Sequence, residues 1–147
     1  MKKILYLHQY FNTNEMNGST RSLEISNALI NQGYEVEMIT ATRSNQKKFP
    51  SNYLGINIKW INAPYGNELS FYKRILMFFK YVYKASYYSL TKDYDLIYCT
   101  STPLTIGIPA LLAYFFRNKK FIFEARDIWP EIPVAMKIIK NKLLIWV

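Results

Sequence analysis

The 147-residue sequence has very little cysteine and glycine, and both shortages exclude kinds of site. The single cysteine, Cys99, can form no internal disulfide and no cysteine-based zinc cluster, which fits a reducing cytosol. Only one of the five glycines, Gly18, lies in the first loop, where a dinucleotide fingerprint needs several, and residues 40–43 read Thr-Ala-Thr-Arg where that fingerprint needs an acid. No glycine-lysine-serine/threonine triplet occurs, so NAD and P-loop sites are both disfavoured.

Long hydrophobic runs are also missing. The apolar residues 4–7 are followed by His8, which makes the run too short for the core of a signal peptide. The longest apolar stretch, residues 104–116, is interrupted by Thr105, Gly107 and Pro109 and falls short of the ~20 residues that a membrane-spanning helix needs. We therefore expect a protein that stays in the cytoplasm.

Acidic residues are few. Ten Asp and Glu against nineteen Lys and Arg give a formal net charge of +9, which predicts an anionic partner: nucleic acid, a membrane surface or a phosphorylated substrate. Aromatic residues make up 17% of the chain, thirteen of them tyrosine, which indicates an amphipathic surface. No recognisable nucleic-acid-binding motif accompanies the charge, so nucleic acid is not the expected partner.

The hydrophobic pattern alternates between short apolar runs and segments with helical spacing. Strands are expected at residues 3–7, 35–41, 56–61, 96–100 and 120–124, and helices at 19–31, 69–91, 101–116 and from 131 onward. This order predicts one α/β domain with a doubly wound, Rossmann-like parallel sheet across residues 1–147. Residues 135–147 keep a helical pattern without a polar stop, so we expect the natural protein to continue into a further domain.

In such a sheet, ligands bind beyond the carboxyl ends of the strands, which directs attention to residues 8–21, 101–103 and 124–127. Gly18 lets the backbone approach a ligand, and Ser19 or Thr20 is expected to cap the first helix. The free N–H groups of that helix, with Arg21 in its first turn, form a candidate anion site for a phosphate or carboxylate.

Four segments together resemble a known family: residues 4–11 (ILYLHQYF), 18–21 (GSTR), 100–104 (TSTPL) and 123–131 (FEARDIWPE). They are similar to the N-terminal half of bacterial family-4 glycosyltransferases, in particular those that build capsule, O-antigen or exopolysaccharide units. The resemblance implies the two-domain GT-B architecture and retaining, hexosyltransferase-type transfer from a nucleotide-sugar, with no metal or other cofactor. The nucleotide-binding C-terminal domain is absent here, so the fragment alone should be inactive. Asn17 stands where the family usually has a second glycine.

Sugar transfer develops negative charge on the departing diphosphate, and the acceptor hydroxyl must lose a proton. Asp127 is the candidate to orient or deprotonate that hydroxyl, held in place by Arg126 or Glu124. The structural alternatives are a turn at Gly18, an ion pair or cap at residues 126–127, and a hydrogen-bonded core histidine at position 8. Ser101 and Thr102 are expected mainly to cap a helix, and contact with a ligand is their second expected role. The candidate substrate-binding residues are Gly18, Ser19, Thr20, Arg21, His8, Ser101 and Thr102.

The helix expected at residues 69–91 is basic and amphipathic, and its aromatic arc is wider than one contact with a sheet requires. One interpretation is a helix that packs on the sheet and exposes its lysines; the other is partial contact with an anionic membrane. A peripheral enzyme on the inner membrane face, acting on a polyprenyl-linked saccharide acceptor, would use such a face. The alternative overall is a non-catalytic basic module that binds a membrane or protein partner. The residues assigned to the membrane face are Lys73, Arg74, Phe78, Lys80, Tyr81 and Lys84.

Overall fold

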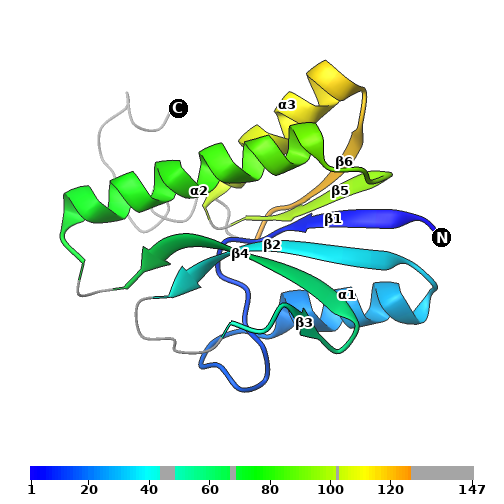
Figure 1. Ribbon diagram of the computed structural model, residues 1–147, viewed down its shortest axis with the longest axis horizontal. Helices are drawn as coiled ribbons and strands as arrows, with labels where there is room; N and C mark the ends of the chain where they lie inside the picture. The colour runs from blue at the N-terminus through cyan, green and yellow to red at the C-terminus, as the bar shows by residue number, and fades with distance from the viewer. Residues whose placement is uncertain (44–48, 67–68, 102, 127–147) are drawn as a thin grey trace, which may run out of the picture.

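A computed structural model describes residues 1–43, 49–66, 69–101 and 103–126. A six-stranded sheet forms the centre, with α1 on one face and α2 and α3 on the other (Figure 1). Asp127 and the helix expected from residue 131 lie outside the described residues. The elements in chain order are β1 (Lys3–Leu7), α1 (Arg21–Asn31), β2 (Glu35–Arg43), β3 (Asn52–Tyr53), β4 (Ile56–Tyr65), α2 (Phe71–Thr91), β5 (Leu96–Thr100), the 3-10 turn η1 (Leu104–Ile106), α3 (Gly107–Arg117) and β6 (Lys120–Glu124).

The strand order is β3-β4-β2-β1-β5-β6, and every neighbouring pair except β3 with β4 is parallel. The chain winds from β1 through β2 to β4 in one direction and then returns to β5 and β6 on the other side of β1. This confirms the doubly wound α/β sheet. The order reverses between β1 and β5, and in such sheets the ligand crevice opens beyond the carboxyl ends of the strands at that point.

The central strands are apolar because both of their faces are covered. Leu5 and Leu7 of β1 face a core shared with α2 and α3, whereas Tyr6 faces the core on the α1 side. All three side chains are fully buried. This explains why β1 reads as a continuous apolar run instead of an alternating one.

The segment between β2 and β4 differs most from the expectation. A two-residue strand, β3, pairs antiparallel with β4 through a turn at Leu54 and Gly55, both of which have positive φ. β4 also continues to Tyr65 instead of ending at residue 61, because Pro64 is tolerated on a strand near the edge of a sheet. The hairpin was missed because Leu-Gly is a weak turn signal compared with Asn-Gly.

Three helices begin later than expected, and one of them is α2, which begins at Phe71 instead of residue 69. α1 begins at Arg21, and the hydroxyl of Thr20 donates to the Glu24 carboxylate (3.0 Å) instead of capping the helix backbone. After β5, the short turn η1 precedes α3, which begins only at Gly107. The expectation that Ser101 caps this helix is wrong, since its hydroxyl is used elsewhere, as described below.

The end of the sheet opposite the candidate site is held by an ion-pair cluster. The carboxylate of Glu37 lies 3.1 Å from Lys3 Nζ and 3.1 Å from Lys92 Nζ. Burial alone would raise the pKa of Glu37, but the hydrogen bonds and charges of these two lysines outweigh it, so the pKa lies below its usual 4.5. Glu37 therefore stabilises the fold above pH 4.5, and this contribution is lost as the pH falls through its lowered pKa.

Replacing Glu37 with glutamine should lower the free energy of unfolding by about 1–2 kcal/mol at neutral pH, because a carboxylate that is largely buried loses two lysine partners. Urea unfolding at pH 7 measures the loss. Repeating it at a pH below 4.5 should give a smaller difference between wild type and Glu37→Gln, since the contribution of the carboxylate charge is lost as the pH falls from 4.5 toward the lowered pKa. A difference that does not change with pH would contradict this role for the carboxylate charge.

Candidate functional site

The carboxyl ends of β1, β5 and β6 carry a connected polar network. Tyr6 and Thr100 share a hydrogen bond of 2.9 Å between their hydroxyl oxygens, and the Thr100 hydroxyl donates to Glu124 Oε2 at 2.7 Å. Glu124 Oε1 lies 2.6 Å from Arg21 Nε, the ion pair that joins β6 to the first turn of α1. Burial, the largest influence on Tyr6, raises its pKa, so its hydroxyl stays protonated and available as a donor.

The network fixes Arg21 while leaving part of it exposed. Glu124 has 11% of its side chain exposed, whereas Arg21 has 60% exposed. The guanidinium has five N–H donors in a rigid fork, and the contact with Glu124 uses the Nε edge. The sequence suggested that Glu124 would hold a neighbouring catalytic residue; in the structure it holds Arg21. What Arg21 presents to solvent is a positioned cation at the N-terminus of α1, which suits an anion.

The loop before α1 is packed tightly around Gly18. This glycine has φ of +140°, a conformation that L side chains rarely adopt. The Nδ2 of Asn12 donates to the Ser19 carbonyl at 3.0 Å. A Cβ added to Gly18 would lie only 2.5 Å from this Nδ2, which is closer than real Cβ contacts. Ser19 Oγ accepts from the Arg21 N–H at 3.4 Å. The turn and the anion-site interpretations of Gly18 are therefore compatible, because the turn leads directly through Ser19 and Thr20 to Arg21 at the start of α1.

Arg43, at the end of β2, is a site residue that the sequence reasoning missed. Its Nη1 donates to the Asn17 carbonyl at 2.7 Å and so ties β2 to the loop before Gly18. The available signal was a basic residue at the carboxyl end of a strand next to β1. Together with Arg21, Arg43 adds positive charge to this end of the sheet.

His8 follows β1 and is 2% exposed. Its Nδ1 shares a 2.7 Å hydrogen bond with Ser22 Oγ of α1. Burial, reinforced by the charges of Arg126 and Arg43, lowers the pKa of His8 to about 4. The imidazole is therefore neutral at physiological pH, so His8 acts through hydrogen bonding and not as a cation. This arrangement agrees with the alternative of a hydrogen-bonded core histidine.

Ser101 connects the ends of β5 and β6. Its N–H donates to the Glu124 carbonyl at 2.9 Å, and its hydroxyl accepts from the Arg126 N–H at 2.8 Å. Arg126 is exposed, so its side chain lies at the rim. Ser101 thus positions the backbone that leads to Asp127. Thr102 and Asp127 themselves lie outside the described residues.

No group of three or more His, Cys, Asp or Glu side chains that could hold a metal ion occurs within the described ranges. Cys99 is buried in the core of the α2 and α3 side, and burial raises the pKa of its thiol to about 12. Its thiol donates to the Ile122 carbonyl at 3.3 Å. Cys99 is therefore a small core residue in its unreactive, protonated form.

α2 was expected to carry a membrane face, and the structure corrects that face at two positions. Tyr81 is 0% exposed and its hydroxyl donates to the Ile39 carbonyl at 3.0 Å, so it belongs to the core and the assignment to an exposed face is wrong. Phe78 is partly buried against the same core. Lys73, Lys80 and Lys84 are exposed, and Arg74 is half-buried with its Nε donating to the Leu69 carbonyl.

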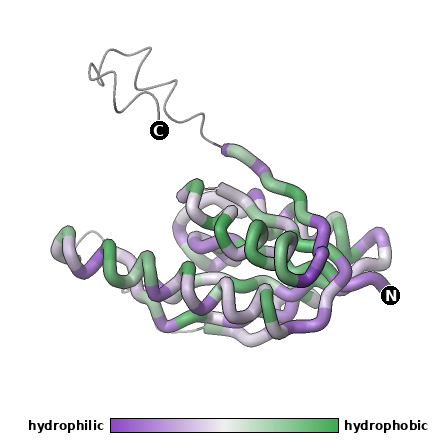
Figure 2. The backbone as a smooth tube through the Cα atoms, turned by 90° about the horizontal axis from the view of Figure 1, so that it is seen from above, coloured by the Kyte–Doolittle hydropathy of each residue, from purple (hydrophilic) through white to green (hydrophobic). Residues whose placement is uncertain are grey.

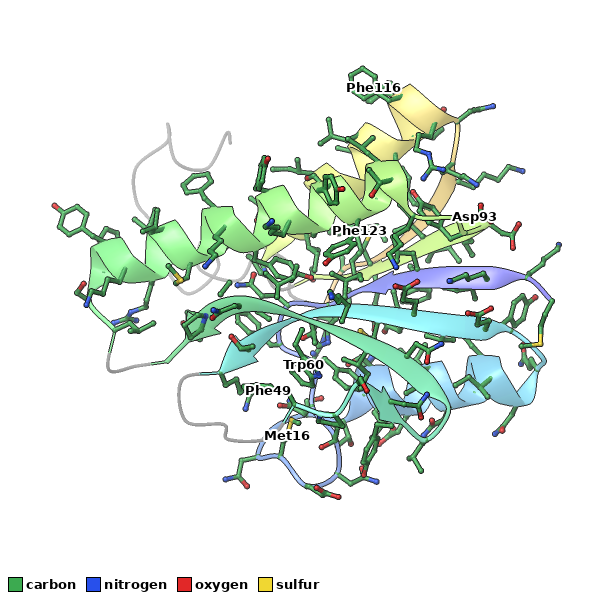
Figure 3. All side chains as sticks on the ribbon, in the orientation of Figure 1. Met16, Phe49, Trp60, Asp93, Phe116 and Phe123 are labelled. Atoms are coloured by element: carbon green, nitrogen blue, oxygen red, sulfur yellow. The ribbon has the colours of Figure 1, made fainter. Side chains whose placement is uncertain are left out.

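The exposed apolar surface extends from α2 onto α3, which the sequence reasoning did not foresee. The two helices pack side by side, and hydrophobic positions predominate along α3 and recur along α2 (Figure 2). Phe116 stands at the end of α3 and points away from the sheet (Figure 3). In the part of the chain that the structure describes, no helix is long and apolar enough to cross a membrane. The large exposed apolar side chains of these helices are Phe71, Tyr72, Ile75, Leu76, Phe79, Tyr83 and Tyr87 on α2 and Ile108, Leu111, Tyr114, Phe115 and Phe116 on α3, with Leu104 in the turn η1 just before it.

Comparison with known proteins shows the fold alone. No protein-family model and no curated protein matches the chain. Two crystal structures of the C-terminal domain of a hydrogenase from Pyrococcus furiosus match 84% of this chain, each with a TM-score of 0.58. The first is 12% identical to this chain and is covered to 91% of its length, and the second is 13% identical and covered to 92%. Sucrose-phosphate synthase from Thermosynechococcus elongatus is 12% identical with a TM-score of 0.58, over 97% of this chain and 36% of that protein. The fold is thus distantly similar to part of a GT-B glycosyltransferase.

Proposed function

We propose that this chain is the acceptor-side domain of a retaining glycosyltransferase that moves a sugar from a nucleotide-sugar to a saccharide acceptor on a lipid carrier in surface polysaccharide synthesis. The observation that carries the proposal is Arg21, which Glu124 holds at the N-terminus of α1, where the strand order reverses. Transfer develops charge on the leaving diphosphate, and a fixed cation beside free helix N–H groups stabilises it.

Other features agree with that role. Arg43 and Arg126 place positive charge near His8, which is neutral, buried and hydrogen-bonded to Ser22 and so supports the start of α1 from beneath. Ser101 fixes the backbone before Asp127, the residue proposed to orient or deprotonate the acceptor. The fold itself does not select this activity, because a hydrogenase domain shares it. The likeness to sucrose-phosphate synthase and the residues of the crevice support sugar transfer together.

The experiment is transfer from a panel of nucleotide-sugars to a polyprenyl-diphosphate-linked sugar, with this domain joined to its downstream sequence. Product formation from one donor, lost in Asp127→Ala while the circular-dichroism spectrum is unchanged, supports the proposal. Failure with every donor would favour the alternative of a non-catalytic basic module.

The exposed face of α2 and α3 supports a second part of the proposal, association with an anionic membrane. Lys73, Lys80 and Lys84 form a basic row beside the apolar row of α2, and α3 widens the apolar area. Apolar side chains that enter the lipid interface next to cations that meet anionic headgroups are the pattern of a peripheral membrane protein. A transferase that acts on a lipid-linked acceptor needs such placement on the inner face of the cell membrane.

Replacing Phe79 and Phe115 together with serine should lower binding to anionic vesicles about 10- to 100-fold, because two large exposed apolar side chains no longer enter the interface. Vesicle sedimentation measures the change, and wild-type binding should weaken as salt is added. Ile122→Ser is the matched control, since Ile122 is exposed on β6 away from this face. Equal losses in both variants, or equal binding to oligonucleotides, would contradict the assignment.

A further inference from the structure

A hollow of about 150 Å³ lies between the outer strand β4 and α2. It is distinct from the candidate site, because none of its six lining residues belongs to the polar network of β1, β5 and β6 or to the contact of Arg43 at the end of β2. Three successive residues of β4 form one wall, and three residues of α2 spaced by one turn form the other. Its lining residues are Trp60, Ile61, Asn62, Lys80, Lys84 and Tyr88.

The hollow is positively charged without compensation. Lys80 and Lys84 are one helical turn apart, and none of the ion pairs found among the described residues involves either of them. No acidic side chain lines the hollow. Two neighbouring ammonium groups repel each other. An anion that binds between them is attracted to both and offsets that repulsion.

The edge of β4 adds a backbone donor. The Ile58 N–H donates outward to the Ser51 carbonyl at 2.8 Å, and the alternation of a strand directs the N–H group of Trp60 to the same outer edge. Asn62 follows Ile61, where the register between β4 and β2 shifts. β3 pairs with β4 only as far as Asn57. Beside Trp60 this edge meets the segment before β3, since the Trp60 indole N–H donates to the Pro50 carbonyl at 2.8 Å and its ring centroid lies 5.1 Å from that of Phe49. Pro64 further along has no N–H to offer another strand. The surroundings therefore suit a small anion instead of a peptide.

The neighbouring surface identifies the source of that anion. On α2 the basic row has the hollow on one side and the exposed apolar row, with Phe79 and Tyr83, on the other. On a membrane that receives this apolar row, an anion that reaches Lys80 and Lys84 would belong to the headgroup layer just above the acyl chains. A volume of 150 Å³ equals that of about five waters, enough for a phosphate group with part of a glycerol.

We propose that this hollow binds the phosphate of a membrane phospholipid headgroup and so fixes how the domain is oriented on the membrane. The inference deepens the proposed membrane association and rests on it. Phosphate oxygens would accept hydrogen bonds from Lys80, Lys84 and the outward N–H of Trp60 on β4, whereas the other cation of the basic row, Lys73, meets the surface only through its charge.

The test compares Lys80→Gln/Lys84→Gln with Lys73→Gln in the full chain. Binding is measured on phosphatidylcholine vesicles that carry either phosphatidylglycerol or oleate at equal surface charge. General attraction contributes a factor of about five per basic residue on either surface. We expect the double variant to lose at least about 100-fold on phosphatidylglycerol but only about 25-fold on oleate, and Lys73→Gln to lose about fivefold on both.

A second measurement uses glycerol 1-phosphate in solution. It should shift the backbone amide resonances of Trp60 and Asn62 in wild type and not in the double variant. The absence of amide shifts in wild type would overturn the phosphate site. Amide shifts together with equal vesicle losses would assign the hollow to a free phosphate and overturn the lipid source. Wild-type protein that binds neither kind of vesicle would overturn the membrane association itself, whereas sugar transfer in detergent would remain a separate test of the enzyme.

Discussion

Replacing Gly18 with alanine is expected to lower kcat/KM for sugar transfer by at least about 100-fold while the domain stays folded. A Cβ at this position would stand 2.5 Å from Asn12 Nδ2, and the backbone has φ of +140°, so both the loop and the Asn12 amide must move. Asn12 holds the carbonyl of Ser19, which precedes the first turn of α1 and therefore Arg21. A displacement of about 1 Å here misplaces the anion site relative to the donor diphosphate.

Gly33→Ala is the matched control for this effect. Gly33 has φ of +85° and open space around the added Cβ, so it carries the same kind of backbone strain at the far end of α1. Both variants should lose about 1 kcal/mol or more of unfolding free energy in urea titrations. Only Gly18→Ala should lose activity. Equal activity losses in the two variants would show that stability, and not the position of the loop, limits transfer.

The sequence predicted the sheet well because its strands are buried on both faces and its turns contain strong signals. β5 and β6 were predicted at their observed limits, since the polar residues 93–95 and 117–119 mark where each of these two short runs begins. The hairpin with β3 and the extension of β4 were not predicted, because pairing between strands decides them and local propensity does not. A Pro at an edge strand looks like a turn until its neighbours are known.

The sequence predicted which residues lie near one another in the candidate site, but not which of them contact each other. The rule that ligands meet the carboxyl ends of parallel strands selected His8, Arg21, Ser101 and Glu124 correctly as neighbours in space. The ion pair between Arg21 and Glu124 joins residues 103 positions apart, and no periodicity reports such a contact. Arg43 was missed for the same reason. The error at Tyr81 arose because a helix that packs on both a sheet and a second helix buries a wider arc than its amphipathic pattern indicates.

Replacing Arg21 with methionine should have the other large effect, a fall in kcat of about 100- to 1,000-fold with little change in stability. Methionine keeps most of the length and the apolar stem but removes the charge that the developing diphosphate needs. Arg21 is 60% exposed, so its ion pair with Glu124 contributes little to folding. The loss should therefore appear in steady-state kinetics and not in the urea midpoint.

Arg21→Lys and Glu124→Gln separate charge from position. Lysine restores the charge without the planar fork, and glutamine leaves the arginine but weakens the ion pair that fixes its Nε, so each variant should keep more activity than Arg21→Met. Because Glu124 also accepts from Thr100, the glutamine variant should lose some stability, which the arginine variants do not. If Arg21 acts on the leaving diphosphate, the loss in Arg21→Met should be smaller for a donor whose leaving group departs more easily. A loss that is the same for every donor, and confined to KM, would instead make Arg21 a residue for ground-state binding.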